Sequence, residues 1–137
     1  KYADSYLRER NVPPLIFQGR LNLIDRAVQE EGILEYCKEA GIGFIGFSPL
    51  AQGLLTSRYL DGIPQDSRMA KGGSLKENML TPELLEQLRA WNAEALNQGE
   101  TLASKSLKWV LGQEGVTSVI VGARTPEQLS QSLKCLY

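Results

Sequence analysis

Apolar and polar residues follow one another along this chain in blocks that predict strands and helices in alternation. Compact apolar runs at residues 15–18, 42–47 and 117–121 are typical of buried strands. Pro13 and Pro14 separate the first run from the polar segment before it, because proline ends a helix. Apolar residues at helical spacing predict helices over residues 2–10, 30–40, 81–99, 101–111 and 125–135.

The order of these elements predicts an α/β fold. Strands that are apolar throughout and alternate with helices are typical of a parallel sheet with helices on its faces. We expect residues 1–137 to form one partial domain, whose three strands leave two open sheet edges. Residues 59–80 lack periodicity, and loops of that length inside compact domains are commonly binding loops or lids.

Composition removes several classes of function. The 137 residues carry 15 basic and 16 acidic side chains, so no basic field indicates nucleic-acid binding. No apolar run approaches the roughly 20 residues that span a bilayer, and no signal segment opens the chain. The chain has no histidine, which removes the commonest general base and metal ligand, and we predict no metal site.

Two further features concern the redox compartment of the protein and the extent of the chain. Cys37 and Cys135 lie far apart in helical segments, which favours two reduced thiols in a cytoplasmic protein. A disulfide or a shared metal is the alternative. The chain begins at Lys1 without methionine and inside an expected helix, so we expect a piece of a longer protein.

The end of the second strand is the first candidate ligand site. Phe47, Ser48 and Pro49 stop the strand abruptly, and Gly53 follows where its main chain can approach a ligand. An aromatic ring at a strand end can stack on a flat ring, and Ser48 with nearby amides can hold phosphate oxygens. A core phenylalanine followed by a plain turn is the alternative.

The third strand leads to a second candidate site. Gly122, Ala123 and Arg124 run directly into a helix that Thr125 caps. Free N–H groups and the positive dipole end of a helix attract phosphate, and Arg124 adds donors suited to a phosphate monoester. Gln128, one turn further on, can reach an adenine or a sugar hydroxyl. A capped surface helix is the alternative.

Three loop cations and one amide complete the candidates. Arg58, Arg68 and Lys71 can close over an anion, or they are ordinary solvated charges. Gln18, at the expected end of the first strand, offers an amide that can pair with another amide.

In combination these motifs resemble the aldo-keto reductase superfamily over essentially the whole chain. The resemblance rests on Gly-Phe-Ser-Pro-Leu-Ala-Gln-Gly-Leu-Leu at 46–55, Gly-Ile-Pro-Gln-Asp-Ser-Arg at 62–68 and Val-Gly-Ala-Arg-Thr-Pro-Glu-Gln-Leu at 121–129. It is strongest with the branch that holds bacterial glyceraldehyde 3-phosphate reductases and potassium-channel β-subunits. It implies the C-terminal portion of a (β/α)8 TIM barrel, about three of the eight strands, with the cofactor at their carboxyl ends.

The resemblance also implies that the cofactor is NADPH. Gln18 would contact the nicotinamide carboxamide, and the Phe47 ring would stack on the nicotinamide. Arg68 and Arg124 would meet the 2′-phosphate, which favours NADP over NAD on charge grounds, and Gln128 would meet the adenosine. The remaining implied contacts, to the pyrophosphate and its surroundings, are Ser48, Pro49, Leu50, Gly53, Leu54, Arg58, Gly122 and Ala123.

The chain departs from the family pattern at the adenine end and in one turn. Leu21 stands where the family usually has a tyrosine before an asparagine. Gln131 and Ser132 replace an acid and an asparagine that hold the adenine. Each lost neutral hydrogen bond lowers the expected affinity by about 0.5–1.5 kcal/mol.

No catalytic residue is assigned. The family's chemistry needs a tyrosine proton donor with lysine, aspartate and histidine on the first four strands, and no tyrosine here matches that position. We therefore expect the NADPH-binding part of an oxidoreductase for aldehydes and ketones, such as glyceraldehyde 3-phosphate or methylglyoxal, that is inactive by itself. Two alternatives are an NADPH-binding regulatory subunit like the channel β-subunits, and a half-barrel that only forms a homo-oligomer.

Overall fold

The elements alternate between helix and strand along most of the chain. The structure is a computed structural model and describes residues 1–67 and 69–136. The helices are α1 (Tyr2–Arg8), α2 (Ala27–Glu30), α3 (Ile33–Glu39), α4 (Pro82–Asn97), α5 (Leu102–Leu111) and α6 (Pro126–Leu133). The strands are β1 (Ile16–Arg20), β2 (Gly43–Phe47) and β3 (Val116–Val119). Short 3₁₀ helices are η1 (Ala51–Gly53), η2 (Ser57–Tyr59), η3 (Glu77–Met79) and η4 (Lys134–Leu136).

The chain divides into two compact units, each with its own packing. The first unit contains Lys1–Pro49 and Trp109–Gly122, and the second contains Leu50–Lys108 and Ala123–Tyr137. The sheet belongs to the first unit, whereas α4, α6 and the long loop belong to the second. Helix α5 contributes residues to both.

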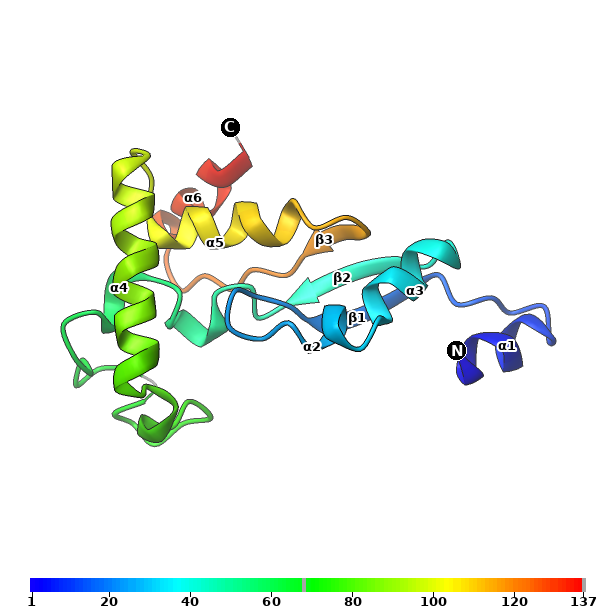
Figure 1. Cartoon of the computed structure of the whole chain (residues 1–137), viewed down its shortest axis with the longest axis horizontal. Coiled ribbons are helices and arrows are strands. Elements are labelled where there is room, and N and C mark those ends of the chain that lie inside the picture. The colour runs from blue at the N-terminus through cyan, green and yellow to red at the C-terminus, as the bar shows by residue number, and fades with distance from the viewer. Residues whose placement is uncertain (68, 137) are drawn as a thin grey trace. The chain divides into compact units, whose positions relative to one another are not determined.

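The three strands form one parallel sheet in the order β1-β2-β3 (Figure 1), as the sequence predicts. Pairing of β1 with β2 is uninterrupted and ends with Arg20 opposite Phe47. Between β2 and β3 the register shifts next to Phe44, whose main-chain N–H donates to Thr117 Oγ1 at 3.2 Å. A side-chain oxygen thus satisfies a donor that the irregular ladder leaves without a carbonyl.

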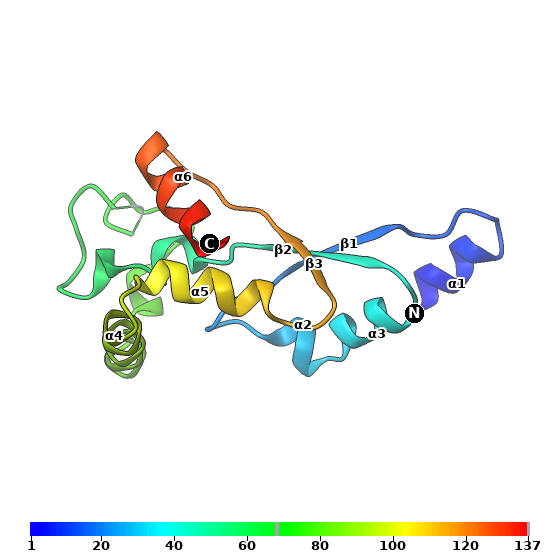
Figure 2. The ribbon, with the colours of Figure 1, turned by 90° about the horizontal axis from the view of Figure 1, so that it is seen from above.

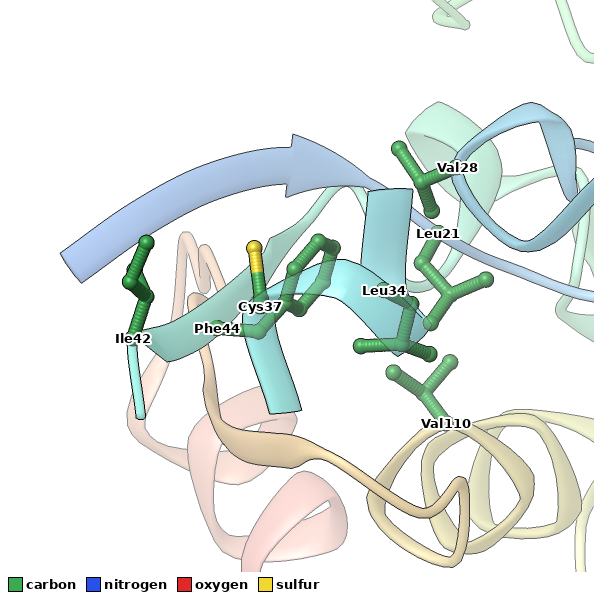
Figure 3. Close-up of a cluster of buried hydrophobic side chains, with 7 residues drawn as sticks. All are labelled: Leu21, Val28, Leu34, Cys37, Ile42, Phe44 and Val110. Atoms are coloured by element: carbon green, nitrogen blue, oxygen red, sulfur yellow. The ribbon is translucent and has the colours of Figure 1, made fainter. Parts of the chain in front are cut away.

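One face of the sheet carries the core of the first unit. Helices α2 and α3 lie on the same side of the strands (Figure 2). Alternation along β2 turns Phe44 and Gly46 toward these helices, and Phe44 is completely buried. The buried cluster of Figure 3 consists of Leu21, Val28, Leu34, Cys37, Ile42, Phe44 and Val110.

Strand β1 differs from its expected form. It continues past Gln18 to Arg20, because both added residues pair with β2. The expectation of a buried strand is also wrong for β1, since Ile16 is 60% and Phe17 40% exposed. An edge strand with one uncovered face exposes apolar residues that a central strand would bury.

Two other boundaries differ from the sequence-based expectation. Strand β3 ends at Val119 rather than at residue 121, although the Ile120 N–H still donates to the Gly46 carbonyl at 2.8 Å. The helix expected over residues 30–40 is α3, which begins only at Ile33, and Glu30 is instead the last residue of the separate short helix α2.

The second unit is built around α4, the long green helix of Figure 1, and the loop before it. Thr81 Oγ1 accepts the Leu84 N–H at 3.2 Å and Pro82 is the first helical residue, which confirms the predicted helix start. The long loop packs on its own core of Leu54, Tyr59, Met69 and Leu75. The Arg89 guanidinium of α4 donates twice to the Leu60 carbonyl, at 3.1 and 2.8 Å, and ties the loop to the helix.

Gly19 marks a point of close approach between β1 and the core. A Cβ atom there would lie 2.9 Å from Phe44 Cζ and 3.0 Å from Val28 Cγ1. We expect Gly19→Ala to lower the free energy of unfolding by about 1–3 kcal/mol, because both neighbours are held in a packed cluster. Urea denaturation measures the change. Gly122→Ala is the control, since a Cβ at Gly122 meets nothing within 4 Å. Equal losses for the two variants would contradict the steric explanation.

Candidate functional site

The two units divide the predicted cofactor residues between them. Arg68 lies outside the described residues. Assembly of the remaining residues into one site stays a prediction, and each unit is described on its own. The first unit holds Gln18, Phe47, Ser48, Pro49 and Gly122, and the second holds Leu50, Gly53, Leu54, Arg58, Ala123, Arg124 and Gln128.

The carboxyl end of β2 is held by a buried asparagine. Asn22 is 1% exposed, and its Nδ2 donates to the Ser48 carbonyl at 3.0 Å. Its Oδ1 accepts the N–H groups of Ile24 at 3.0 Å and Asp25 at 2.8 Å. Ser48 itself has φ of 52°, a left-handed conformation that is uncommon outside glycine and costs about 1 kcal/mol or more. The strand end that we predicted as a ligand site therefore has a strained backbone held by a buried side chain.

The sequence motifs include Asn22 only as the residue after an atypical Leu21 and imply no role for it. A polar residue between Leu21 and Leu23, both buried, is the signal that was available. A buried amide must find partners, so Asn22 in an apolar run indicates a hydrogen-bonded structural position.

The face of the sheet opposite the core carries the Phe47 ring and the Gln18 amide. Gln18 stands opposite Ile45, and Arg20 stands opposite Phe47, so alternation places all four on one face. Gln18 is exposed and the Phe47 ring is half-buried. Contrary to expectation, Gln18 is in the middle of β1 and Arg20 occupies its end. The Arg20 Cζ atom lies 5.6 Å from the centroid of the Phe47 ring.

The loop after β2 turns through three consecutive left-handed residues. Ala51, Gln52 and Gly53 have φ of 47°, 59° and 103°. The Gly53 N–H donates to the Leu50 carbonyl at 2.8 Å, and the Leu54 N–H donates to the Ala51 carbonyl at 3.2 Å. These two donors are therefore engaged within the turn in this conformation. The Leu54 side chain belongs to the core of the second unit, where it packs with Tyr59, Met69 and Leu75.

Arg58 is already paired in this structure. Its Nη2 atom lies 2.6 Å from Asp66 Oδ2. The hydrogen bond from Arg58 is the main reason that the pKa of Asp66 lies below its ordinary value. Both side chains are exposed, so the pair is screened by solvent and exchange of Asp66 for a phosphate oxygen costs little.

The start of α6 carries Arg124 and Gln128. Thr125 Oγ1 accepts the Gln128 N–H at 3.3 Å, and Gln128 Oε1 accepts the Arg124 N–H at 2.9 Å. The predicted Thr125 cap is therefore present, and Gln128 reaches back to the main chain of Arg124, one residue before the position that a standard capping box uses. Among residues 1–67 and 69–136, no carboxylate forms an ion pair with the exposed Arg124 guanidinium. Ala123 and Gly122 are exposed beside it.

Cysteines and acidic side chains are the remaining groups that could carry chemistry in the described residues. Cys37 and Cys135 are free thiols, and burial raises the pKa of both. Within the described part of the chain, no group of three or more cysteine, aspartate or glutamate side chains is placed to hold a metal ion. No described helix combines the length and apolar character that a bilayer crossing requires.

Comparison with known proteins identifies the family of this chain. The profile of the Aldo/keto reductase family matches residues 1–136. The chain belongs to the aldo/keto reductase family. The family resemblance read from the sequence motifs is thereby confirmed.

Several aldo/keto reductases of known activity are similar to this chain. L-glyceraldehyde 3-phosphate reductase of Escherichia coli K12 is 45% identical over 95% of this chain and 39% of its own length. The enzyme of the same name from E. coli O157:H7 matches to the same extent. NADH-specific methylglyoxal reductase of E. coli K12 is 33% identical over 88% of this chain and 36% of its own length. The chain thus spans less than half the length of these relatives.

A solved structure shows the same fold. A thermostable aldo-keto reductase in complex with the inhibitor epalrestat matches 97% of this chain and 38% of its own, with a TM-score of 0.65 and 22% identity. The predicted α/β fold of an aldo/keto reductase portion, with three parallel strands, is confirmed. Closure with further strands into an eight-stranded barrel stays a prediction.

Proposed function

We propose that this chain is the C-terminal, NADPH-binding part of a cytoplasmic oxidoreductase that reduces aldehydes and ketones to alcohols. The observation that carries the proposal is the 45% identity with L-glyceraldehyde 3-phosphate reductase over 95% of the chain. NADPH supplies a hydride for the carbonyl carbon in this chemistry. The residues of this chain bind and orient the cofactor, and the proton donor belongs to another part of the protein.

The residues at the strand ends support this cofactor. The half-buried Phe47 ring offers a flat apolar surface to a nicotinamide, and Gln18 offers an amide on the same sheet face. Amide pairing suits the carboxamide group of a nicotinamide, and aromatic stacking suits its ring. The strained backbone at Ser48 is typical of a position that a ligand or catalytic site requires.

Arg124 supports NADPH over NADH. Its exposed guanidinium pairs with no carboxylate of the described chain and follows β3 at the start of α6. An unpaired arginine beside helix N–H groups suits the extra 2′-phosphate, which NADH lacks. One relative is NADH-specific by name, so this assignment belongs to the present chain and not to every similar protein.

The substrate proposed is a small carbonyl compound such as glyceraldehyde 3-phosphate or methylglyoxal. The names of the similar enzymes supply both examples. No described side chain is assigned to the carbonyl, because the proposed proton donor lies elsewhere in the protein.

Turnover measurements test the proposal directly. The full-length protein that carries this chain is expected to bind NADPH and to oxidise it when either carbonyl compound is added. The purified 137 residues are expected to give no NADPH oxidation above the rate without protein. Turnover by these residues alone would contradict the placement of catalysis elsewhere. Tight NADPH binding without turnover by the full-length protein would instead favour the regulatory-subunit alternative.

A further inference from the structure

Arg20 is placed beside the ring that is proposed to hold the nicotinamide. The end of β1 sets Arg20 directly opposite Phe47 in the parallel ladder. Its guanidinium carbon lies 5.6 Å from the ring centroid, within the range of a cation–π contact. The sequence motifs assigned no role to this residue. A permanent positive charge therefore accompanies Phe47 at this strand end.

The turn after β1 fixes this charge in position. Arg20 Nη1 lies 3.5 Å from Asp25 Oδ2. Asp25 in turn donates its N–H to the buried Asn22 side chain, which is bonded to the Ser48 carbonyl. The Leu21 N–H also donates to the Phe47 carbonyl, at 3.4 Å. Arg20 and Phe47 are thus linked through one hydrogen-bonded turn and not only through the strand pairing.

We infer that Arg20 makes the site discriminate between the two redox states of the cofactor, weakening NADP⁺ relative to NADPH. This inference rests on the proposed function. The oxidised nicotinamide ring carries a positive charge, whereas the reduced ring is neutral. A guanidinium near a ring stacked on Phe47 repels the oxidised form and leaves the reduced form unaffected. The consequence is easier release of NADP⁺ after hydride transfer, before the next NADPH binds.

The size of the effect follows from the surroundings of the charge. The Arg20 side chain is 55% exposed, and Asp25 offsets part of its charge. Both factors reduce the repulsion between Arg20 and an oxidised nicotinamide ring well below the repulsion between two buried charges. We expect the ratio of the dissociation constants, NADP⁺ over NADPH, to fall about threefold to tenfold in Arg20→Gln.

Dissociation constants for both nucleotides, measured on the full-length protein by calorimetry, test the inference. Arg20→Lys keeps the charge and is expected to retain most of the wild-type ratio. Asp25→Asn removes the compensating carboxylate and is expected to raise the ratio, while its side-chain oxygen can still accept the Ala27 N–H. Arg26→Gln is the matched control, because the Arg26 guanidinium lies 4.5 Å over Trp109 instead of Phe47.

Each outcome decides between the two proposals. Equal weakening of both nucleotides in Arg20→Gln, or an equal change of ratio in Arg26→Gln, would overturn the inference and leave the proposed function standing. Failure of the wild-type protein to bind either nucleotide would overturn the proposed function, and the inference with it. A ratio that falls in Arg20→Gln alone, and by less at high salt, would support the inference.

Discussion

Replacement of Phe44 by alanine is expected to lower the free energy of unfolding by about 3–5 kcal/mol. Phe44 is 0% exposed and lies on the central strand, in the cluster that joins the sheet to α2 and α3. Removal of the ring loses apolar burial and leaves a cavity that the neighbouring strands and helices fill only in part. Urea denaturation of the protein, followed by circular dichroism, measures the loss.

Phe17→Ala is the matched control for this prediction. The Phe17 ring stands beside Phe44 in the ladder, with the two centroids 6.0 Å apart, but it is 40% exposed. Its removal is expected to cost about 1 kcal/mol, mainly the ring–ring contact and partial burial. Similar losses for the two phenylalanines would show that the cluster of Figure 3 does not dominate the stability of this unit.

Arg124→Ala is expected to weaken NADPH binding about 10- to 100-fold and to change NADH binding by less than about twofold. The difference arises because only NADPH has the 2′-phosphate. A charge-assisted hydrogen bond is worth about 1.5–3 kcal/mol, and no ion pair within the described residues competes for the Arg124 guanidinium. Fluorescence titration of the full-length protein with each nucleotide measures both constants.

The control for Arg124 is another exposed cation in the same C-terminal segment. Lys134→Ala removes one positive charge at the opposite end of α6. It is expected to leave the NADPH constant unchanged within about twofold, since a distant exposed charge is screened by salt. Equal weakening of NADPH and NADH in Arg124→Ala would contradict contact with the 2′-phosphate and indicate a structural role instead.

Features governed by local rules were predictable from the sequence. The starts of α4 and α6 were predictable because Thr81 and Thr125 are each followed directly by a proline. A helix cap depends on only three or four successive residues. The parallel α/β arrangement followed from apolar runs that alternate with helical segments. The sequence motifs were also sufficient to place the chain in the aldo/keto reductase family.

Features that depend on neighbours distant in sequence were not predictable. The exposure of Ile16 and Phe17 follows from the place of β1 at the sheet edge, which its apolar composition does not encode. The extension of β1 to Arg20 follows from pairing with Phe47, which lies 27 positions further along the chain. The apolar pattern of β1 alone predicts neither its exposure nor its length, because the register between two strands is set by the packing of both strands.

The sequence by itself determined the order of elements, the family and the identities of the candidate cofactor residues. Those properties depend on hydrogen bonds between nearby residues and on motifs that are contiguous along the chain. Only the tertiary structure decided that Asn22 supports the strained backbone at Ser48 and that Arg20 accompanies the Phe47 ring. Both relations join residues of different strands and turns, and the parallel pairing of β1 with β2 is the physical cause that brings them together.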